Sequence, residues 1–324
     1  MRYVDLGPLK HVSRLTLGGG GLGRLWGETS LAEAIATTRA AVDAGITLID
    51  TAPMYLDCEQ VIGAAFEGAL PSHVRLTSKH ALGEPARGEV AGRLEASLDA
   101  SLAAMRAPRA DIFFLHSNLC ADDYVYSRHN DRRPSFATPW SVYVNEVVPA
   151  MEALKARGRI GAWGITGIGV PSTVLKALAH DPAPDVVQAI SNLLDSAGGI
   201  RNFAEPARPR EIIAAAKARG VGVLGIRAVQ AGALTAGLDR TVKDSHPEAA
   251  DFRRAAPFRD LCAKLGVDPA VLAHRYALDM KGVDSVILGV KNRAELTACL
   301  DAEAAGPLPP DLRARIDGLG LAEA

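Results

Sequence analysis

Four chemically versatile side chains lie at or just beyond the ends of short apolar runs. Asp50, Lys79 and His116 each close a run that reads as a β-strand, and Tyr55 follows the first run after a short loop. Parallel strands in a barrel open their carboxyl ends onto one face, where chemistry collects. Residues that are far apart in the sequence could therefore surround a single pocket.

Together these four residue types suit proton transfer to an oxygen atom. A tyrosine hydroxyl has a pKa of about 10 and is a poor acid or base at neutral pH. A cation such as Lys79 would lower that pKa, and a carboxylate such as Asp50 would keep the lysine charged. A neutral His116 could hydrogen-bond a substrate oxygen and orient it. The set predicts a general acid/base for a carbonyl or alcohol, with a cofactor to carry the hydride.

Each residue taken alone also has a structural explanation. A strand-end aspartate often caps a turn, a loop tyrosine is often half-buried, and a strand-end lysine often points to water. His116 follows an apolar run and could be a core histidine. What favours a site is the placement of all four after consecutive predicted strands.

The chain alternates strand-like and helix-like segments from end to end. Short continuous apolar runs are typical of parallel strands buried on both faces. The predicted strands are Leu15–Leu17, Thr47–Ile49, Arg75–Ser78, Ile112–Leu115, Ile160–Ile165, Val186–Ala189, Val221–Ile226 and Ser285–Leu288. The clearest predicted helices are Leu31–Ala44, Val90–Met105, Val147–Ala156, Pro209–Arg219 and Asp268–Leu278. We predict one α/β domain over residues 1–324, a closed (β/α)8 TIM barrel, with an open doubly wound sheet as the alternative.

Two further segments have predictable places. Arg2–Leu17 should hold a small N-terminal hairpin that caps the barrel floor, and Ser117–Ser141 should form a long loop after the fourth strand. That loop would lie over the same face as the four candidates. Its Tyr126 and Trp140 could therefore wall a substrate pocket, or the loop could simply pack on itself.

Composition bounds the partners. The net charge is -1 in 324 residues, so there is no electrostatic case for nucleic acid or an anionic membrane. The four cysteines show no metal-ligand spacing, and the N-terminus lacks the apolar core of a signal peptide. We expect a cytoplasmic protein with reduced thiols, no bound metal and a small-molecule substrate; the oligomeric state is left open.

At this point the sequence resembles a known family. The segment Asp50–Tyr55 (DTAPMY), the pair Ser78-Lys79 and the pair Leu115-His116 resemble the catalytic signature of the aldo-keto reductases. The stretches Arg157–Ile165 and Ser285–Gly289 are similar to the family's fifth and eighth strands, and a fainter likeness is to its aldose and pyridoxal dehydrogenase branch. The resemblance implies a nicotinamide-dependent oxidoreductase. By this resemblance Tyr55 would donate or accept the proton, Lys79 and Asp50 would tune the pKa of Tyr55, and His116 would orient the substrate.

The resemblance also implies a nicotinamide site, with departures. Where the family has a Ser-Asn pair this chain has Thr166 and Gly167, so a carboxamide contact would have to come from the backbone or from Asn192. Gln188 matches the family's glutamine. Ile226 stands where an aromatic ring often stacks. Arg227 could approach the pyrophosphate or form a salt bridge at the barrel rim.

The adenosine end of the implied site follows the eighth strand. Gly289 and Val290 would lie beside the dinucleotide, and Glu295 stands where NADP-using relatives often have an arginine. A carboxylate there would repel a 2′-phosphate and accept hydrogen bonds from a 2′-hydroxyl. Lys291 and Arg293 argue the other way, because both could pair with a phosphate. We favour NAD, with NADP as the rival.

A glycine run follows the first strand. A run of this kind is weak evidence for dinucleotide binding. We expect Gly20 to let the cofactor or substrate approach the backbone. Trp26 could wall the pocket or pack against the first helix.

The predicted function is reversible oxidation of an alcohol or hemiacetal to a carbonyl or lactone. Two other classes remain open. The protein could be a regulatory subunit that binds nicotinamide nucleotide without significant turnover. It could also be a metal-dependent barrel hydrolase or isomerase, because one fold hosts many chemistries.

Overall fold

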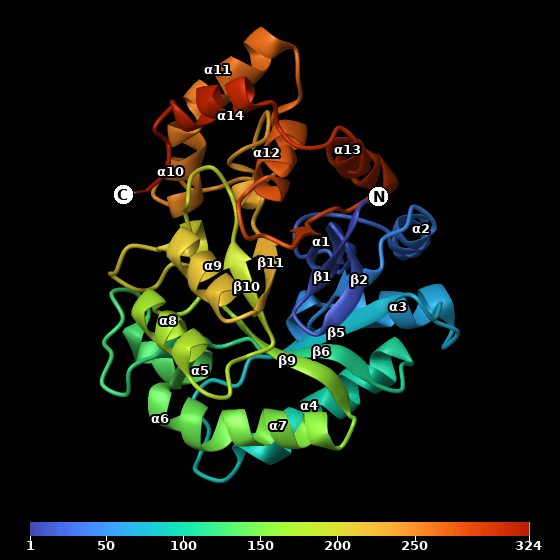
Figure 1. The fold of residues 1–324 in the computed structure, drawn as a ribbon, viewed down its shortest axis with the longest axis vertical. Coiled ribbons are helices and arrows are strands. Elements are labelled where there is room, and N and C mark those ends of the chain that lie inside the picture. Colours follow the sequence, from blue (N-terminus) through green and yellow to red (C-terminus); the bar gives the residue numbers. More distant parts are fainter. Residues whose placement is uncertain (324) are drawn as a thin grey trace.

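Eight parallel strands close into a barrel. The computed structural model describes residues 1–323, and Figure 1 shows the strands at its centre. In sequence the barrel strands are β3 (Leu15–Gly18), β4 (Leu48–Asp50), β5 (Arg75–His80), β6 (Ala110–Leu115), β9 (Ile160–Thr166), β10 (Val186–Ile190), β11 (Gly222–Ile226) and β12 (Ser285–Leu288). The last strand pairs with the first, Val286 opposite Leu15, which closes the ring. The predicted barrel is confirmed, and the open doubly wound sheet is wrong.

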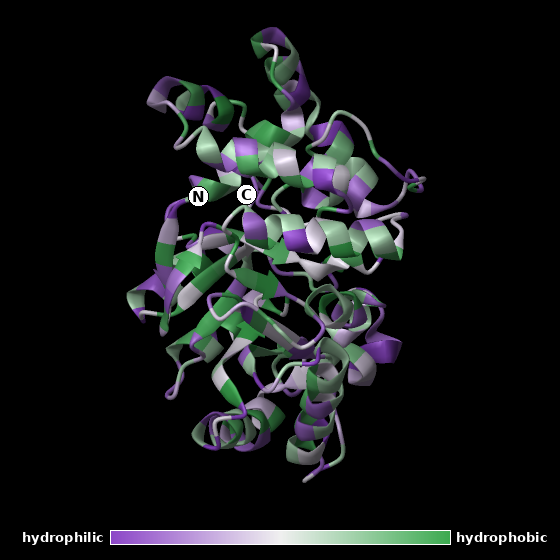
Figure 2. Ribbon diagram, turned by 90° about the vertical axis from the view of Figure 1, so that its right-hand side faces the viewer, coloured by the Kyte–Doolittle hydropathy of each residue, from purple (hydrophilic) through white to green (hydrophobic). Residues whose placement is uncertain are grey.

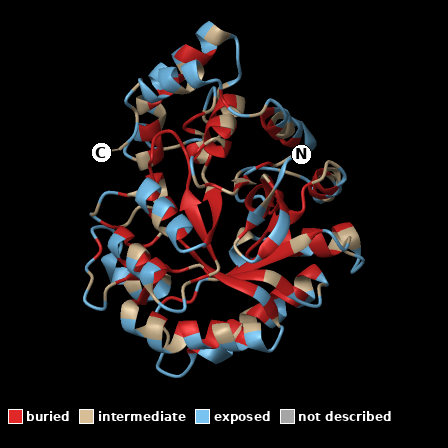
Figure 3. Cartoon of the chain, viewed as in Figure 1, coloured by how far each residue is buried: buried red, intermediate tan, exposed pale blue. Residues whose placement is uncertain are grey.

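Helices surround the barrel and bury one face each. The longer ones are α2 (Leu31–Asp43), α3 (Cys58–Phe66), α4 (Val90–Met105), α7 (Val148–Ala156), α8 (Pro171–Ala179), α9 (Pro209–Ala218), α10 (Pro247–Arg254), α11 (Ala256–Leu265), α12 (Pro269–Leu278), α13 (Arg293–Ala304) and α14 (Pro310–Asp317). In α4, Leu94 and Leu98 lie one turn apart and are fully buried. Asp268 caps α12 by accepting hydrogen bonds from its first turn. Figures 2 and 3 show the same division, with apolar buried strands and polar outer helix faces.

The floor of the barrel is closed by the predicted hairpin. Strands β1 (Tyr3–Leu6) and β2 (Leu9–Ser13) are antiparallel, and Gly7 supplies the positive φ of their turn at +53°. Leu6 and Val12 pack against inward-facing barrel side chains that include Phe114. The hairpin therefore seals the end of the barrel opposite the strands' carboxyl ends.

Phe114 fills the barrel interior only because its neighbour has no side chain. A Cβ on Gly164 would lie 2.4 Å from Phe114 Cε1 and 2.5 Å from the Val186 carbonyl oxygen. Interior layers of a barrel must interdigitate large and small residues to reach native packing density. Gly164 is thus the small residue that lets one phenylalanine plug the centre.

The β6 loop, residues 117–141, follows the fourth barrel strand as predicted but carries short regular elements. It contains β7 (Asn118–Cys120) paired with β8 (Ala137–Pro139), a 3-10 turn η2 (Asn130–Arg132) and α5 (Arg133–Phe136), and it leads into α6 (Trp140–Val142). Strands of three residues are too short to show a sequence period.

No helix in residues 1–323 has the length and apolar character needed to cross a membrane.

We predict that Gly164→Ala destabilises the protein by about 1 to 3 kcal/mol, because the new methyl group overpacks the interior. Urea unfolding measures the change. Gly92→Ala is the matched control, since Gly92 lies in α4 with nothing within 4 Å of the added Cβ. It should stabilise the protein by about 0.5 to 1 kcal/mol. Equal effects of the two substitutions would contradict this account of the core.

Candidate active site

The structure brings the four predicted residues together at the carboxyl end of the barrel. Lys79 Nζ donates to Asp50 Oδ2 at 2.6 Å and to the Thr51 carbonyl at 2.7 Å. The same Nζ lies 4.6 Å from the centroid of the Tyr55 ring. The Tyr55 and His116 rings meet edge to face, with centroids 5.9 Å apart. One cluster therefore holds a carboxylate, an ammonium, a phenol and an imidazole.

Asp50 is fixed by three neighbours. In addition to Lys79, its Oδ1 accepts hydrogen bonds from Thr77 Oγ1 at 2.8 Å and from Gln188 Nε2 at 2.7 Å. Asp50 and Lys79 are almost completely buried. A buried ion pair loses hydration, so it persists only where further hydrogen bonds satisfy its atoms. Gln188, expected beside the nicotinamide, is also part of this support.

Burial and charge set the protonation of the cluster. Burial alone would lower the pKa of Lys79, but the adjacent Asp50 raises that pKa above its usual value, so the amine stays charged. Burial raises the pKa of Tyr55, and Lys79 offsets only part of that rise. The expected lowering is therefore wrong as a net effect, because loss of hydration outweighs the ammonium. Burial, reinforced by Lys79, lowers the pKa of His116 to about 3, so its imidazole is neutral.

Glu59 is a supporting residue that the sequence analysis missed. It lies in the first turn of α3 and is only 5% exposed. Its Oε1 accepts a hydrogen bond from Ser78 Oγ at 2.7 Å, next to Lys79 in β5. A carboxylate near a helix N-terminus is favoured by the helix dipole. Nothing in the sequence separates such a buried glutamate from a solvated one.

The backbone beside Tyr55 is strained. Tyr55 ends a 3-10 turn, η1 (Pro53–Tyr55), and Leu56 follows with φ +53° and ψ −118°. This is a conformation that a leucine rarely adopts and that costs about 1 to 3 kcal/mol. The Leu56 side chain is 55% exposed, so its packing does not offset the strain. A Cβ on Gly23 would collide with the Tyr55 carbonyl at 1.7 Å, which shows how closely the loop after β3 presses on this turn.

The glycine run serves packing within the protein. Short helix α1 (Gly19–Leu22) forms here, and a Cβ on Gly21 would lie 2.0 Å from the Val290 carbonyl oxygen. A Cβ on Gly20 would lie 2.4 Å from Trp26 Nε1, so the indole of Trp26 occupies the space beside that glycine. The approach of a ligand to the Gly20 backbone stays a prediction. Trp26 packs along this loop and comes near the exposed Gly289.

The residues expected at the carboxamide are partly committed elsewhere. Thr166 Oγ1 donates to the Leu115 carbonyl at 3.3 Å. A Cβ on Gly167 would lie 2.7 Å from the Gln188 carbonyl, so the missing asparagine has a steric reason. Asn192 uses its amide nitrogen on the Arg227 carbonyl and on Gln230 Oε1, at 3.1 and 3.2 Å. It therefore does not replace that asparagine.

The two residues at or just after the end of β11 that were predicted to contact the nucleotide contact other parts of the protein. Ile226 packs with Ile190 in a small apolar cluster. Arg227, with φ +60°, forms a salt bridge to Glu248 at 3.0 Å and donates from Nε to Gln230 Oε1 at 2.8 Å. The alternative of a rim salt bridge is thus confirmed.

The charged residues after β12 are paired within the protein. Lys291 Nζ lies 2.7 Å from Asp239 Oδ2 and 3.1 Å from Glu295 Oε1. Glu295 Oε2 also accepts a hydrogen bond from the Lys291 backbone at the start of α13. Arg293 pairs with Glu33 of α2 at 2.9 Å. Both cations that argued for a phosphate are therefore already neutralised.

The predicted substrate wall is wrong for both aromatic residues. Tyr126 is 3% exposed and packs edge to face against Tyr124 and Phe136 within the β6 loop. Trp140 lies among outer helices, with Lys176 Nζ 4.0 Å from its ring centroid and His180 beside it. The alternative of loop self-packing is what the structure shows for Tyr126, whereas Trp140 packs against residues outside the loop.

Comparison with known proteins agrees with this geometry. The family model described as "Aldo/keto reductase family" matches residues 14–320. The chain belongs to the aldo/keto reductase family. Members of this family are oxidoreductases that use a nicotinamide nucleotide and act on small carbonyl compounds. In residues 1–323 no three His, Cys, Asp or Glu side chains are grouped to hold a metal ion.

Among curated relatives, L-galactose dehydrogenase of Arabidopsis thaliana is 24% identical over 290 residues, covering 88% of this chain and 82% of that protein. Methylglyoxal reductase YeaE of Escherichia coli (strain K12) is 33% identical over 140 residues, 41% of this chain and 39% of that protein. Among solved structures, aldo-keto reductase AKR11C1 from Bacillus halodurans (holo form) superposes with a TM-score of 0.72 at 20% identity, covering 98% and 96% of the two chains. Glycerol dehydrogenase AKR11B4 from Gluconobacter oxydans gives 0.71 at 20% identity, covering 98% and 94%. At that identity the likeness to the solved structures shows the shared fold.

We predict that His116→Asn makes the protein less sensitive to acid. Between about pH 6.5 and about 3 the unfolded chain binds a proton that the folded imidazole does not. The free energy of unfolding therefore decreases as the pH is lowered through that window. Asparagine removes the titrating group. Urea unfolding at pH 7, 6, 5 and 4 should show the variant gaining on the wild type as pH falls. His129→Asn, at an exposed position, is the control, and profiles that stay parallel would contradict the prediction.

Proposed function

We propose that this protein is an NAD(P)-dependent, aldose-type dehydrogenase or reductase that interconverts an alcohol or hemiacetal with a carbonyl or lactone. The observation that carries the proposal is the Lys79 ammonium. It is buried, held by Asp50, and 4.6 Å from the Tyr55 ring. A charge in this position stabilises the phenolate that forms when Tyr55 gives up its proton.

The site residues divide the work of proton transfer. In the reducing direction the Tyr55 hydroxyl donates its proton to the substrate oxygen as that oxygen gains charge, and Lys79 stabilises the resulting phenolate. Asp50 keeps Lys79 charged and fixes its direction. Neutral His116 donates a hydrogen bond that orients the same oxygen. In the oxidising direction Tyr55 must first lose its proton to solvent, and the phenolate, stabilised by Lys79, then accepts the alcohol proton. The bound nicotinamide nucleotide supplies or accepts the hydride.

Residues around the cluster can hold the nicotinamide end. Gln188 spends its Nε2 on Asp50, and no donor in residues 1–323 bonds its Oε1, which leaves an acceptor for a carboxamide. Thr166 lies opposite Gln188 in the paired strand. At the other end Gly289 is exposed, and the Val290 carbonyl already abuts the loop after β3.

We favour NAD over NADP. Lys291 and Arg293 are paired with carboxylates, so a 2′-phosphate would have to displace those carboxylates. Glu295 adds a carboxylate that a 2′-hydroxyl can use and a phosphate cannot. The relatives named for L-galactose and for glycerol oxidise hydroxyl groups by name, which supports an alcohol or hemiacetal as substrate.

We predict that Tyr55→Phe lowers turnover by about a hundredfold to ten-thousandfold, the usual contribution of a positioned acid/base. Affinity for the dinucleotide should stay nearly the same, because the hydroxyl serves the substrate. Steady-state rates on a panel of aldoses, polyols and aldehydes, with nucleotide fluorescence titration, measure both. Tyr143→Phe is the control, since Tyr143 is buried in the core with an unpartnered hydroxyl. Full activity in Tyr55→Phe would sink the mechanism.

The second prediction concerns the nucleotide. Quenching of the tryptophan fluorescence should show tighter binding of NAD(H) than of NADP(H). Glu295→Gln should reduce that preference about fivefold, which is about 1 kcal/mol of charge repulsion near the surface. Asp301→Asn, an exposed carboxylate on the same helix, is the control. Tighter binding of NADP(H) by the wild type would overturn the NAD assignment, and no binding of either nucleotide would overturn the function.

A further inference from the structure

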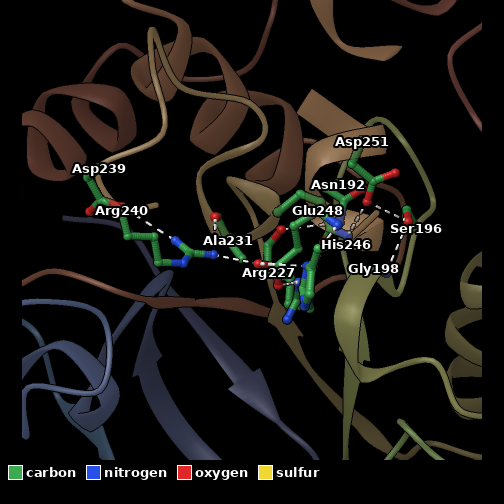
Figure 4. Close-up of polar contacts among 11 residues, drawn as sticks. Asn192, Ser196, Gly198, Arg227, Ala231, Asp239, Arg240, His246, Glu248 and Asp251 are labelled. Atoms are coloured by element: carbon green, nitrogen blue, oxygen red, sulfur yellow. Dashed lines mark hydrogen bonds and ion pairs between the residues drawn. The ribbon is translucent and has the colours of Figure 1, made fainter. Parts of the chain in front are cut away.

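Two loops at the mouth of the barrel meet at helix α10. The β10 loop (residues 191–208) and the β11 loop (residues 227–246) follow neighbouring parallel strands. Figure 4 shows polar side chains from both loops converging on Glu248 and Asp251 of α10. None of these contacts is needed to close the barrel.

Asp251 joins the two loops through a single oxygen atom. Its Oδ2 accepts a hydrogen bond from Ser196 Oγ of the β10 loop at 2.8 Å and another from Gln230 Nε2 of the β11 loop at 2.8 Å. Its Oδ1 accepts from Arg254 of α10 at 2.8 Å. The side chain is only 5% exposed. Water therefore cannot readily replace either loop contact.

Gln230 is the second joint. It is fully buried, and its Oε1 accepts from Arg227 Nε at 2.8 Å and from Asn192 Nδ2 at 3.2 Å. Its backbone has φ +46°, a left-handed conformation that a glutamine keeps only when its surroundings hold it there. Asn192 belongs to the β10 loop, so this amide also ties the two loops together.

Glu248 and Gly198 complete the contact. Glu248 pairs with Arg227 at 3.0 Å and also binds Arg240, so one carboxylate holds the first residue and the later half of the β11 loop. Gly198 has φ +54°, and a Cβ there would lie 2.5 Å from Gln230 Nε2 and 3.0 Å from Arg227 Nη2. The β10 loop backbone thus rests directly on the β11 side chains.

The joined loops reach both sides of the mouth. On one side, Asn202 of the β10 loop accepts hydrogen bonds from the Arg128 backbone at 3.2 Å and from Ser127 Oγ at 2.9 Å, both in the β6 loop that follows His116. On the other side, Asp239 of the β11 loop pairs with Lys291 after β12. A continuous set of contacts therefore runs from the β6 loop to the proposed nucleotide end.

We propose that Asp251 is a positioning residue that locks the β10 and β11 loops into one body, so that nucleotide binding beside β12 also orders the β6 loop at Ser127 and Arg128. The loop coupling is a property of the protein itself, whereas its use in catalysis rests on the proposed function. Coupling between sites requires an element that both sites bias, and the locked loop pair is that element.

Amide hydrogen exchange on the protein without nucleotide tests the lock directly. Ser196→Ala removes the hydrogen bond from the β10 loop to Asp251, together with the bond that Ser196 Oγ accepts from the Gly198 backbone within that loop at 3.0 Å. Asp251→Asn keeps the size of the side chain, but an amide has only one acceptor oxygen. It therefore cannot accept hydrogen bonds from both loop donors and also from Arg254. Each variant should speed exchange in both loops. Ser172→Ala is the matched control, because Ser172 also bonds a carboxylate of the β10 loop, Glu205 Oε1 at 2.7 Å, outside the network. Faster exchange confined to the β10 loop in Ser196→Ala would overturn the proposal.

A second readout connects the lock to the site. Ser196→Ala should raise the dissociation constant of NAD(H) about fivefold while the turnover number at saturating nucleotide stays close to that of the wild type. The Ser196→Ala/Asp251→Asn double variant should show less than the sum of the two single effects, because both break the same joint. Additive effects would overturn the proposal. If the wild type binds no nucleotide, the proposed function fails, and the exchange experiment still decides the lock.

Discussion

The buried pair between Lys79 and Asp50 is the interaction on which the candidate site depends. Removing two charges from water is costly, and the structure offsets that cost with donors from β5 and β10 and with a carbonyl acceptor just after β4. The same support fixes the direction of the ammonium toward Tyr55. A pair of this kind contributes little to stability relative to apolar packing, and the proposed function gives a reason for its presence in the interior.

Close backbone contact is the second constraint. The loops after β3, β4 and β12 touch through glycines whose missing side chains let one main chain rest on another. That contact presses the turn at Tyr55 into place and leaves Leu56 in an unfavourable conformation. Strain of this sort is tolerated where the surrounding structure dictates the backbone, and it often accompanies functional sites. The rigidity of the turn is what keeps the phenol near the ammonium.

The barrel and the four central residues could be predicted from the sequence because both follow from strand ends. A short apolar run that closes with Asp50, Lys79 or His116 gives the strand, its direction and the side chain at the mouth. Residues that act from helices could not be predicted in this way. Glu59 and Asp251 look like solvated carboxylates in their helices, and only the folded chain shows that they are buried. The contact partners of a loop residue could not be predicted either: Trp140 packs against the outer helices and does not wall the predicted pocket.

The filled barrel interior limits how ligands can enter and leave the site. Phe114, seated against Gly164, and the hairpin beneath it leave no passage through the barrel axis. Every molecule that reaches the cluster must arrive and depart by the one open face. Two ligands that share a single doorway cannot exchange independently when one lies over the other. Where one ligand lies beneath another at that face, the closed floor of the barrel requires the deeper one to enter first and leave last.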